Sequence, residues 1–315
     1  FFIYEKPNGF LEMVDGQQRT TTIYNFSKDR ITSTKKNGKI KVGEVRNYFL
    51  NYKLPIIFLR DVKSPRLLND FYVLINKKGK HLNTPEVNKS EYYDKRFLKL
   101  ANELLNNQNF IDLNLFTEAT SKRMNDRGFV EELLGYLKLG IQEKRSAVET
   151  LLEDDISEND YEPLKKEFND IIAIIHKMNE IKPLKKTRYR QKNDFYTLFS
   201  FVNENIKLEI ETLLYQYRIL LILNGEDKEG DQFIRPTNER CFPLKEYALN
   251  CVSQSNSKRA RIKRLEFFND ILKNQNTDNN DALIEVLRYL GDIFGPHKID
   301  LKKIEKFDLL NLDRL

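Results

Sequence analysis

The sequence of 315 residues is poor in cysteine and glycine and has no long apolar run, and each shortage excludes a class of protein. The two cysteines, Cys241 and Cys251, form no C-x-x-C pair, which argues against a structural zinc site and favours reduced thiols in a cytoplasmic protein. With only 12 glycines, few tight turns are expected, as in a mostly helical chain. No apolar run is long enough to cross a bilayer, and Phe1–Tyr4 is too short for a signal peptide, so we expect no membrane partner.

Several catalytic motifs are also missing. Neither G-x-x-x-x-G-K-S/T nor G-x-S-x-G occurs, which excludes a P-loop NTPase and the nucleophile elbow of α/β hydrolases. An HNH nuclease needs clustered His and Asn around a metal, whereas His81, His176 and His297 are far apart in sequence. We therefore expect a nuclease to lie elsewhere or to be absent. His176 lies near the apolar face of a predicted helix and is interpreted as structural.

The charge balance is mildly basic, with a net charge of +6 and a pI near 9.0. Apolar residues make up 40% of the chain and charged residues 32%, a composition typical of a folded, soluble protein. The basic bias permits a phosphate-bearing partner, and it is equally compatible with a basic surface that makes no specific contact.

The first 95 residues alternate between strand-like and helix-like segments. The turn signal Lys6-Pro7-Asn8-Gly9 separates two short apolar segments, and Gln17–Phe26 follows them as a predicted helix. The predicted strands cover residues 1–4, 10–14, 54–59 and 71–75. The pattern predicts a small α/β domain over residues 1–95. Because the chain begins at Phe1 and not at methionine, we expect its native N-terminus to lie upstream.

From residue 96 to residue 315 the apolar period becomes helical. Apolar residues recur at i, i+3, i+4 and i+7 within 130–141, 168–178 and 283–294, which predicts three amphipathic helices. Ile210–Leu223 is apolar around much of its circumference and is predicted to be a central, buried helix. The expected architecture is therefore an α/β domain followed by a mostly α-helical domain.

The segment around Asp15 carries the strongest chemical signal. A predicted strand runs through Asp15 and Gly16 directly into a helix, whose first turn has unpaired N–H groups and the positive end of the helix dipole. Gly16 allows close approach of a phosphate, Arg19 adds a positive fork, and the hydroxyl group of Thr20 is a further donor. Asp15 is the candidate magnesium ligand, and Asp15 and Arg19 are the candidate catalytic residues. The alternative is an ordinary cap, a turn glycine and a surface charge.

Three segments of the chain together resemble the DUF262 family, which includes GmrSD-type modification-dependent restriction enzymes and the SspE-like defence proteins. The first is V-D-G-Q-Q-R-T-T-T-I at residues 14–23, and the second is an Asn-x-x-Gly-x-x-Leu-x-x-x-Glu element at residues 76–86. The third, at residues 123–127, reads Arg-Met-Asn-Asp-Arg and precedes an apolar helix. Two features depart from the family pattern: its upstream Gln-Arg-x-Tyr-x-Trp element is absent, and Leu74 stands where an arginine is common.

The resemblance implies a ParB/sulfiredoxin-like α/β fold that binds and hydrolyses a nucleoside triphosphate with Mg²⁺. Carried over by position, the nucleotide-binding residues would be Gly16, Gln17, Gln18, Arg19, Thr20, Asn76, Asn83 and Glu86. In such proteins the nucleotide state is thought to control a nuclease, so the expected partners are an HNH-type nuclease domain or subunit, modified phage DNA and further copies of the chain.

Two basic clusters in the second domain are candidate DNA contacts, because arginine and lysine bind phosphates without regard to sequence. The predicted DNA-binding residues are Lys185, Lys186, Arg188, Arg190, Lys258, Arg259, Arg261, Lys263 and Arg264. The alternative is a solvated charged face. Two hypotheses follow for the whole chain. One is an NTP-binding, NTP-hydrolysing regulatory protein of anti-phage restriction, and the other is a non-enzymatic DNA-binding or scaffold module that docks a nuclease.

Overall fold

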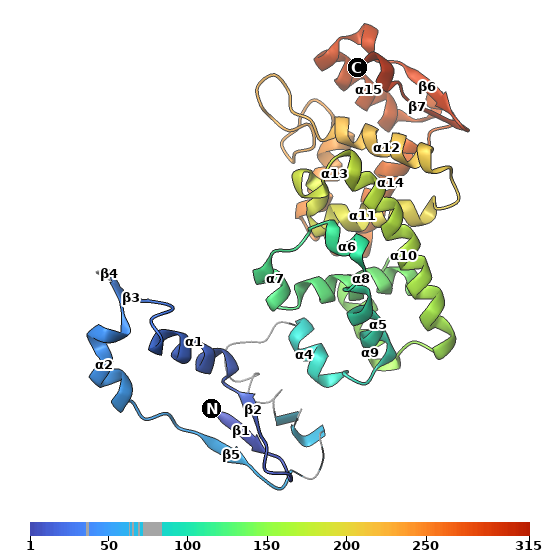
Figure 1. The fold of residues 1–315 in the computed structure, drawn as a ribbon. Helices are drawn as coiled ribbons and strands as arrows, with labels where there is room; N and C mark the ends of the chain where they lie inside the picture. The colour runs from blue at the N-terminus through green and yellow to red at the C-terminus, as the bar shows by residue number, and fades with distance from the viewer. Residues whose placement is uncertain (36–37, 63, 65, 69, 72–83) are drawn as a thin grey trace. The chain divides into compact units, whose positions relative to one another are not determined.

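The computed structural model describes residues 1–35, 38–62, 64, 66–68, 70–71 and 84–315, and it divides the chain into two compact units (Figure 1). The first unit is Phe1–Asn83 and the second is Thr84–Leu315. This division differs from the predicted boundary after residue 95, since it places the helix at Thr84–Glu91 in the second unit.

The first unit contains the small mixed sheet that the sequence predicts. Strands β1 (Phe2–Glu5) and β2 (Leu11–Asp15) form an antiparallel hairpin, and β5 (Ile57–Leu59) pairs with β1 in parallel, giving the order β2-β1-β5. The hairpin turn closes with a 2.8 Å bond from the N–H of Gly9 to the carbonyl of Lys6, and Gly9 has the positive φ of 79° that favours glycine. The strand predicted over 54–59 is thus limited to its second half.

Helical and hairpin segments connect these strands. Helix α1 (Gln17–Ser27) follows β2 directly and matches the predicted helix to within one residue at its C-terminal end. Beyond α1 lie the paired strands β3 (Ser33–Lys35) and β4 (Gly38–Ile40), and then α2 (Val42–Asn51). Phe71 is helical, which contradicts the strand predicted to start there; residues 72–75 of that prediction lie outside the described residues.

The described residues of the first unit bury little apolar surface. Among its described residues Val42 is the one buried apolar side chain, while large apolar side chains such as Phe10, Tyr48 and Tyr52 are more than two-thirds exposed. Since apolar burial is the main favourable term in folding, we expect this unit to open more readily than the helical unit.

The second unit is built from helices. Its α-helices are α4 (Thr84–Glu91), α5 (Arg96–Leu104), α6 (Gln108–Asp112), α7 (Glu118–Lys122), α8 (Asn125–Leu139), α9 (Lys144–Asp154), α10 (Glu158–Ile181), α11 (Lys192–Glu204), α12 (Ile210–Leu223), α13 (Phe242–Val252), α14 (Lys258–Leu272) and α15 (Asp281–Phe294). Short 3₁₀ turns lie at Leu184–Lys186, Arg188–Arg190, Thr277–Asn279, Pro296–Lys298 and Leu312–Arg314. A C-terminal hairpin, β6 (Leu301–Ile304) and β7 (Phe307–Leu310), completes the unit and was not predicted.

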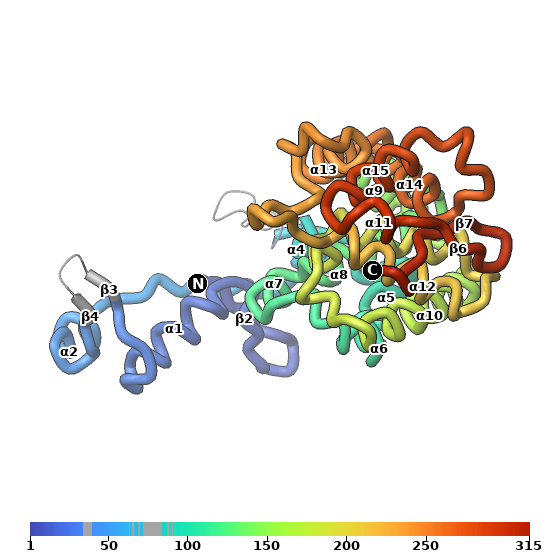
Figure 2. The backbone as a smooth tube through the Cα atoms, turned by 90° about the horizontal axis from the view of Figure 1, so that it is seen from above, coloured from blue at the N-terminus to red at the C-terminus, as the bar shows by residue number. Residues whose placement is uncertain are grey.

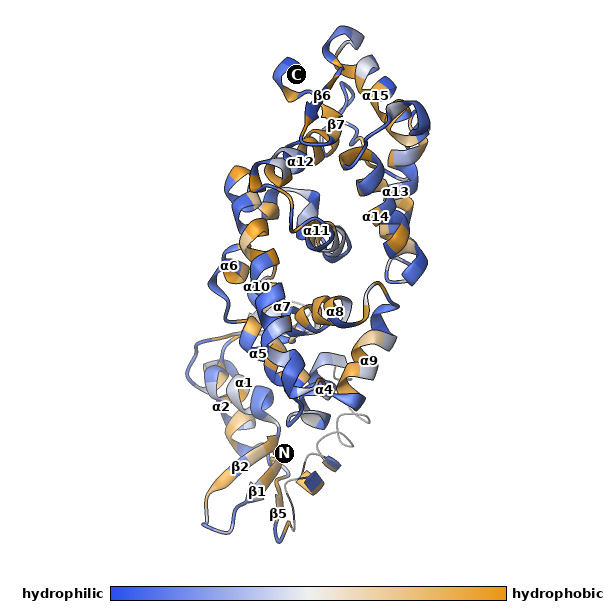
Figure 3. Cartoon of the chain, turned by 90° about the vertical axis from the view of Figure 1, so that its right-hand side faces the viewer, coloured by the Kyte–Doolittle hydropathy of each residue, from blue (hydrophilic) through white to orange (hydrophobic). Residues whose placement is uncertain are grey.

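Helix α11 lies at the centre of this unit, with α8, α10, α12, α13 and α14 around it (Figure 3). Nine consecutive residues of α11, from Asp194 to Val202, are buried. The helix predicted at Ile210–Leu223 exists with those bounds as α12, but it is exposed at Glu211 and Arg218, so α11 and not α12 is the central helix. The three predicted amphipathic helices are confirmed as α8, α10 and α15.

Three of the helices form one group. Helices α13, α14 and α15 pack against one another on the side of the helical unit opposite α6 (Figures 2 and 3). Together these observations confirm the predicted fold class of a small α/β region followed by a mostly helical one.

Candidate functional site

The strand–turn–helix segment at Asp15–Thr20 has the predicted local geometry. Strand β2 ends at Asp15, Gly16 adopts a left-handed conformation with φ 108° and ψ 4°, and α1 begins at Gln17. Within the part of the chain that the structure describes, no side chain caps this end of α1, and its first turn contains no acidic residue. Because the first N–H groups of a helix have no intrahelical partner, the Gly16 turn presents donors that an anion can bind.

Arg19 lies beside this turn and is held in place by two neighbours. Its guanidinium group forms an ion pair with the carboxylate of Asp15 at the end of β2 and lies 4.9 Å from the centroid of the Phe1 ring. The same ring packs against Gly16, where an added Cβ would lie 2.5 Å from Cδ1 of Phe1. Phe1 is thus part of the site, although no sequence motif indicated it.

The other polar residues of the segment differ in what they offer to a ligand. Gln17 donates to the carbonyl of Met13 at 3.2 Å, whereas Gln18 is exposed. The hydroxyl group of Thr20 points to Sδ of Met13, at 3.4 Å. The hydroxyl groups of Thr21 and Thr22 instead donate to carbonyls of α1 itself, which leaves them satisfied within the helix.

Glu86, the last residue of the second motif segment, contacts the third motif segment within the helical unit. Of the predicted supporting residues, Asn76 and Asn83 lie outside the described residues, as does His81. Glu86 lies in α4 and forms a 3.3 Å ion pair with Arg123 of the third segment.

Arg127 continues this contact into the interior. It donates to the carbonyl of Pro85 and forms a 3.0 Å ion pair with Glu131, and both charged side chains are almost fully buried. Loss of solvation raises the pKa of Glu131, while Arg127 opposes the shift. Arg127 and Glu131 therefore join α8 to α4. Apart from Asp15–Thr20, this is where the structure brings residues of the motif segments together.

The first basic cluster is divided between surface and interior. Lys185, Lys186 and Arg190 are exposed, and their contact with DNA phosphates stays a prediction. Arg188 instead forms a 2.7 Å ion pair with the fully buried Asp194. The predicted DNA contact by Arg188 is therefore corrected: its charge neutralises a carboxylate of the core helix α11.

The second basic cluster shows the same division. Lys258, Arg259 and Lys263 are exposed, and Lys263 pairs with Glu266 at 2.8 Å. Arg261 and Arg264 are buried, which corrects the prediction that they contact DNA. Both turn toward the interior because α14 packs on α11 through the face that carries them.

These two arginines have defined partners. Arg261 forms an ion pair with Glu132, and its guanidinium group lies 4.0 Å from the ring centroid of Tyr196. Arg264 donates to the hydroxyl group of Thr197 and to the carbonyl groups of Asn250 and Ser255. The buried polar residues Glu132, Thr197 and Asp194 were not predicted. The partners of Glu132 and Thr197, Arg261 and Arg264, are distant in sequence.

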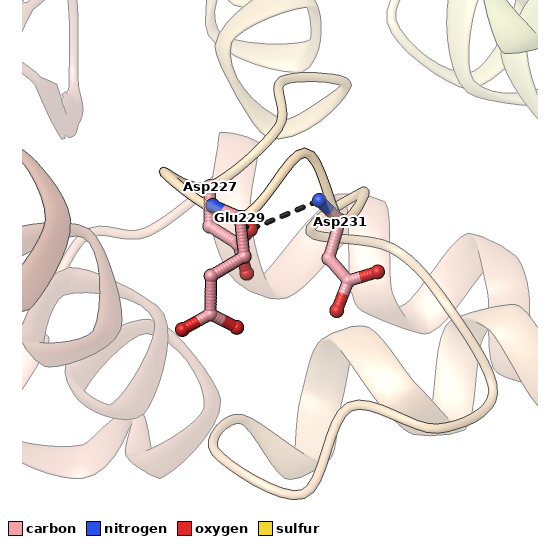
Figure 4. A group of neighbouring side chains, drawn as sticks. All are labelled: Asp227, Glu229 and Asp231. Carbon is pink, nitrogen blue, oxygen red and sulfur yellow. Dashed lines mark hydrogen bonds between the residues drawn. The ribbon is translucent and has the colours of Figure 1, made fainter.

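An acidic loop between α12 and α13 brings three carboxylates together (Figure 4). Asp227, Glu229 and Asp231 each place an oxygen within 4.8 Å of the others. Asp227 accepts bonds from the backbone N–H groups of Glu229 and Asp231, and Arg235 pairs with Asp231 at 3.0 Å. These internal bonds account for the arrangement as a turn in which Arg235 offsets part of the negative charge.

His176, Cys241 and Cys251 are three further side chains that the sequence singles out. His176 lies 3.6 Å from Asp112 and 3.5 Å from Glu180, and its side chain is 24% exposed. Both cysteines are buried and free, and loss of solvation raises the pKa of Cys251 to about 12 and that of Cys241 to about 11. Such thiols are almost wholly protonated at neutral pH and are poor nucleophiles.

Comparisons of the chain with protein-family models, with curated proteins and with solved structures found no match. Among the described residues, no helix has both the length and the apolar composition needed to cross a membrane.

Proposed function

We propose that the chain binds a nucleoside triphosphate with Mg²⁺ at the N-terminal end of α1. The observation that supports this proposal is the uncapped start of α1, where the left-handed Gly16 precedes the first turn and Arg19 is the third residue of the helix. Backbone N–H groups and a guanidinium group are the donors that phosphate oxygens favour.

The ion pair between Asp15 and Arg19 suits a site that takes both a metal and a phosphate. Mg²⁺ is commonly held by one or two carboxylates together with phosphate oxygens, and Asp15 adjoins the turn. When a triphosphate with its metal binds, Asp15 gains a cation and Arg19 gains an anion, so neither charge is left without a partner. In hydrolysis Arg19 would stabilise charge that develops on the phosphates.

In this proposal the chain is a regulatory component of an anti-phage, modification-dependent restriction system, as its resemblance to the DUF262 family implies. The nucleotide state of the first unit would control a nuclease on a partner chain or on a further domain. The ready opening expected of the weakly packed first unit is compatible with a ligand-dependent switch.

Nucleotide binding is tested by the thermal unfolding of the chain with each common ribonucleoside triphosphate and Mg²⁺. A ligand at about 100 times its Kd stabilises the folded state by about 2.7 kcal/mol. We expect a shift that is lost in Arg19→Ala and kept in Arg46→Ala, because Arg46 is an exposed arginine of α2 in the same unit. Hydrogen exchange should slow at the N–H groups of Gln17–Arg19. A shift that persists in Arg19→Ala would contradict this site.

A second function, DNA binding by the helical unit, is supported by the way the two basic clusters are anchored. Arg188 donates to Sγ of Cys251 at 3.7 Å, and Arg264 donates to the carbonyl of the adjacent Asn250 at 2.6 Å. The exposed cations of both clusters therefore project from segments tied to the end of α13. This function predicts DNA binding that weakens steeply with salt and is reduced in Lys185→Ala/Lys186→Ala, with no effect of nucleotide.

A further inference from the structure

A groove between α13, α14 and α15 combines apolar walls with an excess of negative charge. Its first part is a cavity of about 240 Å³ with Phe242, Tyr247 and Phe267 among its lining residues. Five carboxylate side chains and a single lysine, Lys263, complete the polar part of the lining. The carboxylates belong to Glu246, Glu266, Asp270, Asp281 and Glu285.

The groove continues into a second cavity of about 400 Å³. The two cavities share Asp270, Asp281 and Ala282, so these residues mark their junction. The second cavity is lined mainly by asparagine and glutamine side chains of α14 and of the α14–α15 connection, and its lining contains one cation, Lys273. One of the asparagines, Asn269, has a buried side-chain oxygen that accepts no hydrogen bond within the described residues.

Glu246 and the two aspartates at the junction differ from the other two carboxylates of the groove, because their side chains have no hydrogen bond or ion pair within the described part of the chain. Glu266 pairs with Lys263 at 2.8 Å, and Glu285 accepts a 2.7 Å bond from the backbone N–H of Phe242. Loss of solvation and the charge of Glu266 raise the pKa of Asp270, which a bound cation would reverse.

We infer that this groove binds a basic peptide segment of a partner protein and places an arginine side chain between Asp270 and Asp281. The complementary charge defines the class of ligand, and the side-chain amides of Gln275 and Asn279 in the second cavity, which form no hydrogen bond within the described residues, can pair with the peptide backbone. The ring of Phe242, which is 62% exposed at the start of α13, provides an aromatic face for the guanidinium group.

A metal ion fits the groove less well than an arginine. Among the described residues, the groove contributes no group of three carboxylates whose oxygens lie within 4.8 Å of one another. Hard cations need several converging oxygen ligands, whereas a guanidinium group spreads its charge over a plane that can contact two separated carboxylates.

The test is fluorescence anisotropy of a labelled poly-arginine peptide titrated with the full chain at low salt, with poly-glutamate as the negative peptide. We expect Asp270→Asn/Asp281→Asn to weaken poly-arginine binding by about tenfold, and Phe242→Ala by about threefold. The matched control is Asp154→Asn/Glu211→Gln, which removes two exposed carboxylates outside the groove, one of them in the first turn of α12 as Asp281 is in that of α15. Circular dichroism verifies that each variant folds.

Three outcomes would overturn the inference. If poly-arginine does not bind the wild-type chain, a basic peptide is not the ligand of the groove. Equal weakening in the control variant shows that only net charge matters and that the groove is not the site. If spermine displaces poly-arginine at an equal concentration of positive charge, the groove binds free polyamines and not a peptide segment.

Discussion

Replacing Arg261 by methionine tests whether this arginine stabilises the core or contacts DNA. The side chain is 2% exposed, it pairs with Glu132, which is 4% exposed, and it stacks on Tyr196. Methionine fills a similar volume with a flexible apolar chain, so the variant removes the charge while leaving little cavity. Its main consequence is a buried Glu132 that has lost one of its two cationic partners.

Removing one partner of a buried ion pair costs about 3–5 kcal/mol. Lys144 remains 2.8 Å from Glu132 and is 36% exposed, so we expect the lower end, about 3 kcal/mol. In a unit of the size of Thr84–Leu315, each kcal/mol of lost stability lowers Tm by about 2–4 °C, so we expect Tm to fall by about 6–12 °C.

The assay is thermal unfolding followed by circular dichroism, together with DNA binding at low salt. Glu132→Gln in the Arg261→Met background should recover part of the loss, because a neutral amide replaces the poorly compensated charge. Arg259→Met, an exposed position on the same helix, is the control and should change the stability by less than about 0.5 kcal/mol. An unchanged Tm in Arg261→Met, accompanied by weaker DNA binding, would refute the structural role.

Two further predictions concern backbone positions. Gly16→Ala should speed hydrogen exchange in α1 and weaken any nucleotide effect, because alanine is strained by about 1–2 kcal/mol at φ 108° and its Cβ would displace the Phe1 ring. Asp155 is partly desolvated, but bonds from the N–H groups of Phe97, Arg96 and Ile156 outweigh this and lower its pKa. Its contribution is therefore present above the unfolded pKa of about 3.9 and is lost as the pH falls through the lower folded value. Asp155→Asn should be less stable than wild type by about 1 kcal/mol at pH 7, with the difference shrinking below about pH 4; a constant difference would contradict this reasoning.

The local geometry of the candidate site was predictable from nearby residues alone. A strand that ends at Asp15, a glycine turn and a helix from Gln17 follow from short-range rules about turns and helix starts, and the structure has all three. The ring of Phe1 beneath Arg19 was not predictable, because it depends on the pairing of β1 with β2. Likewise, the contact between Glu86 and Arg123 required the packing of α4 on α8.

The sequence by itself determined the fold class and the helices with a strong apolar period. The bounds of α12 and the existence of α8, α10 and α15 follow from spacing along one segment, since helical periodicity is a local property. Only the tertiary structure decided which helix is central and which cations are available to a partner. Within Lys258–Arg264 the same residue type is exposed at Arg259 and buried at Arg261, because burial depends on which face of α14 meets α11, and Glu132 and Tyr196, which receive Arg261, are distant in the chain.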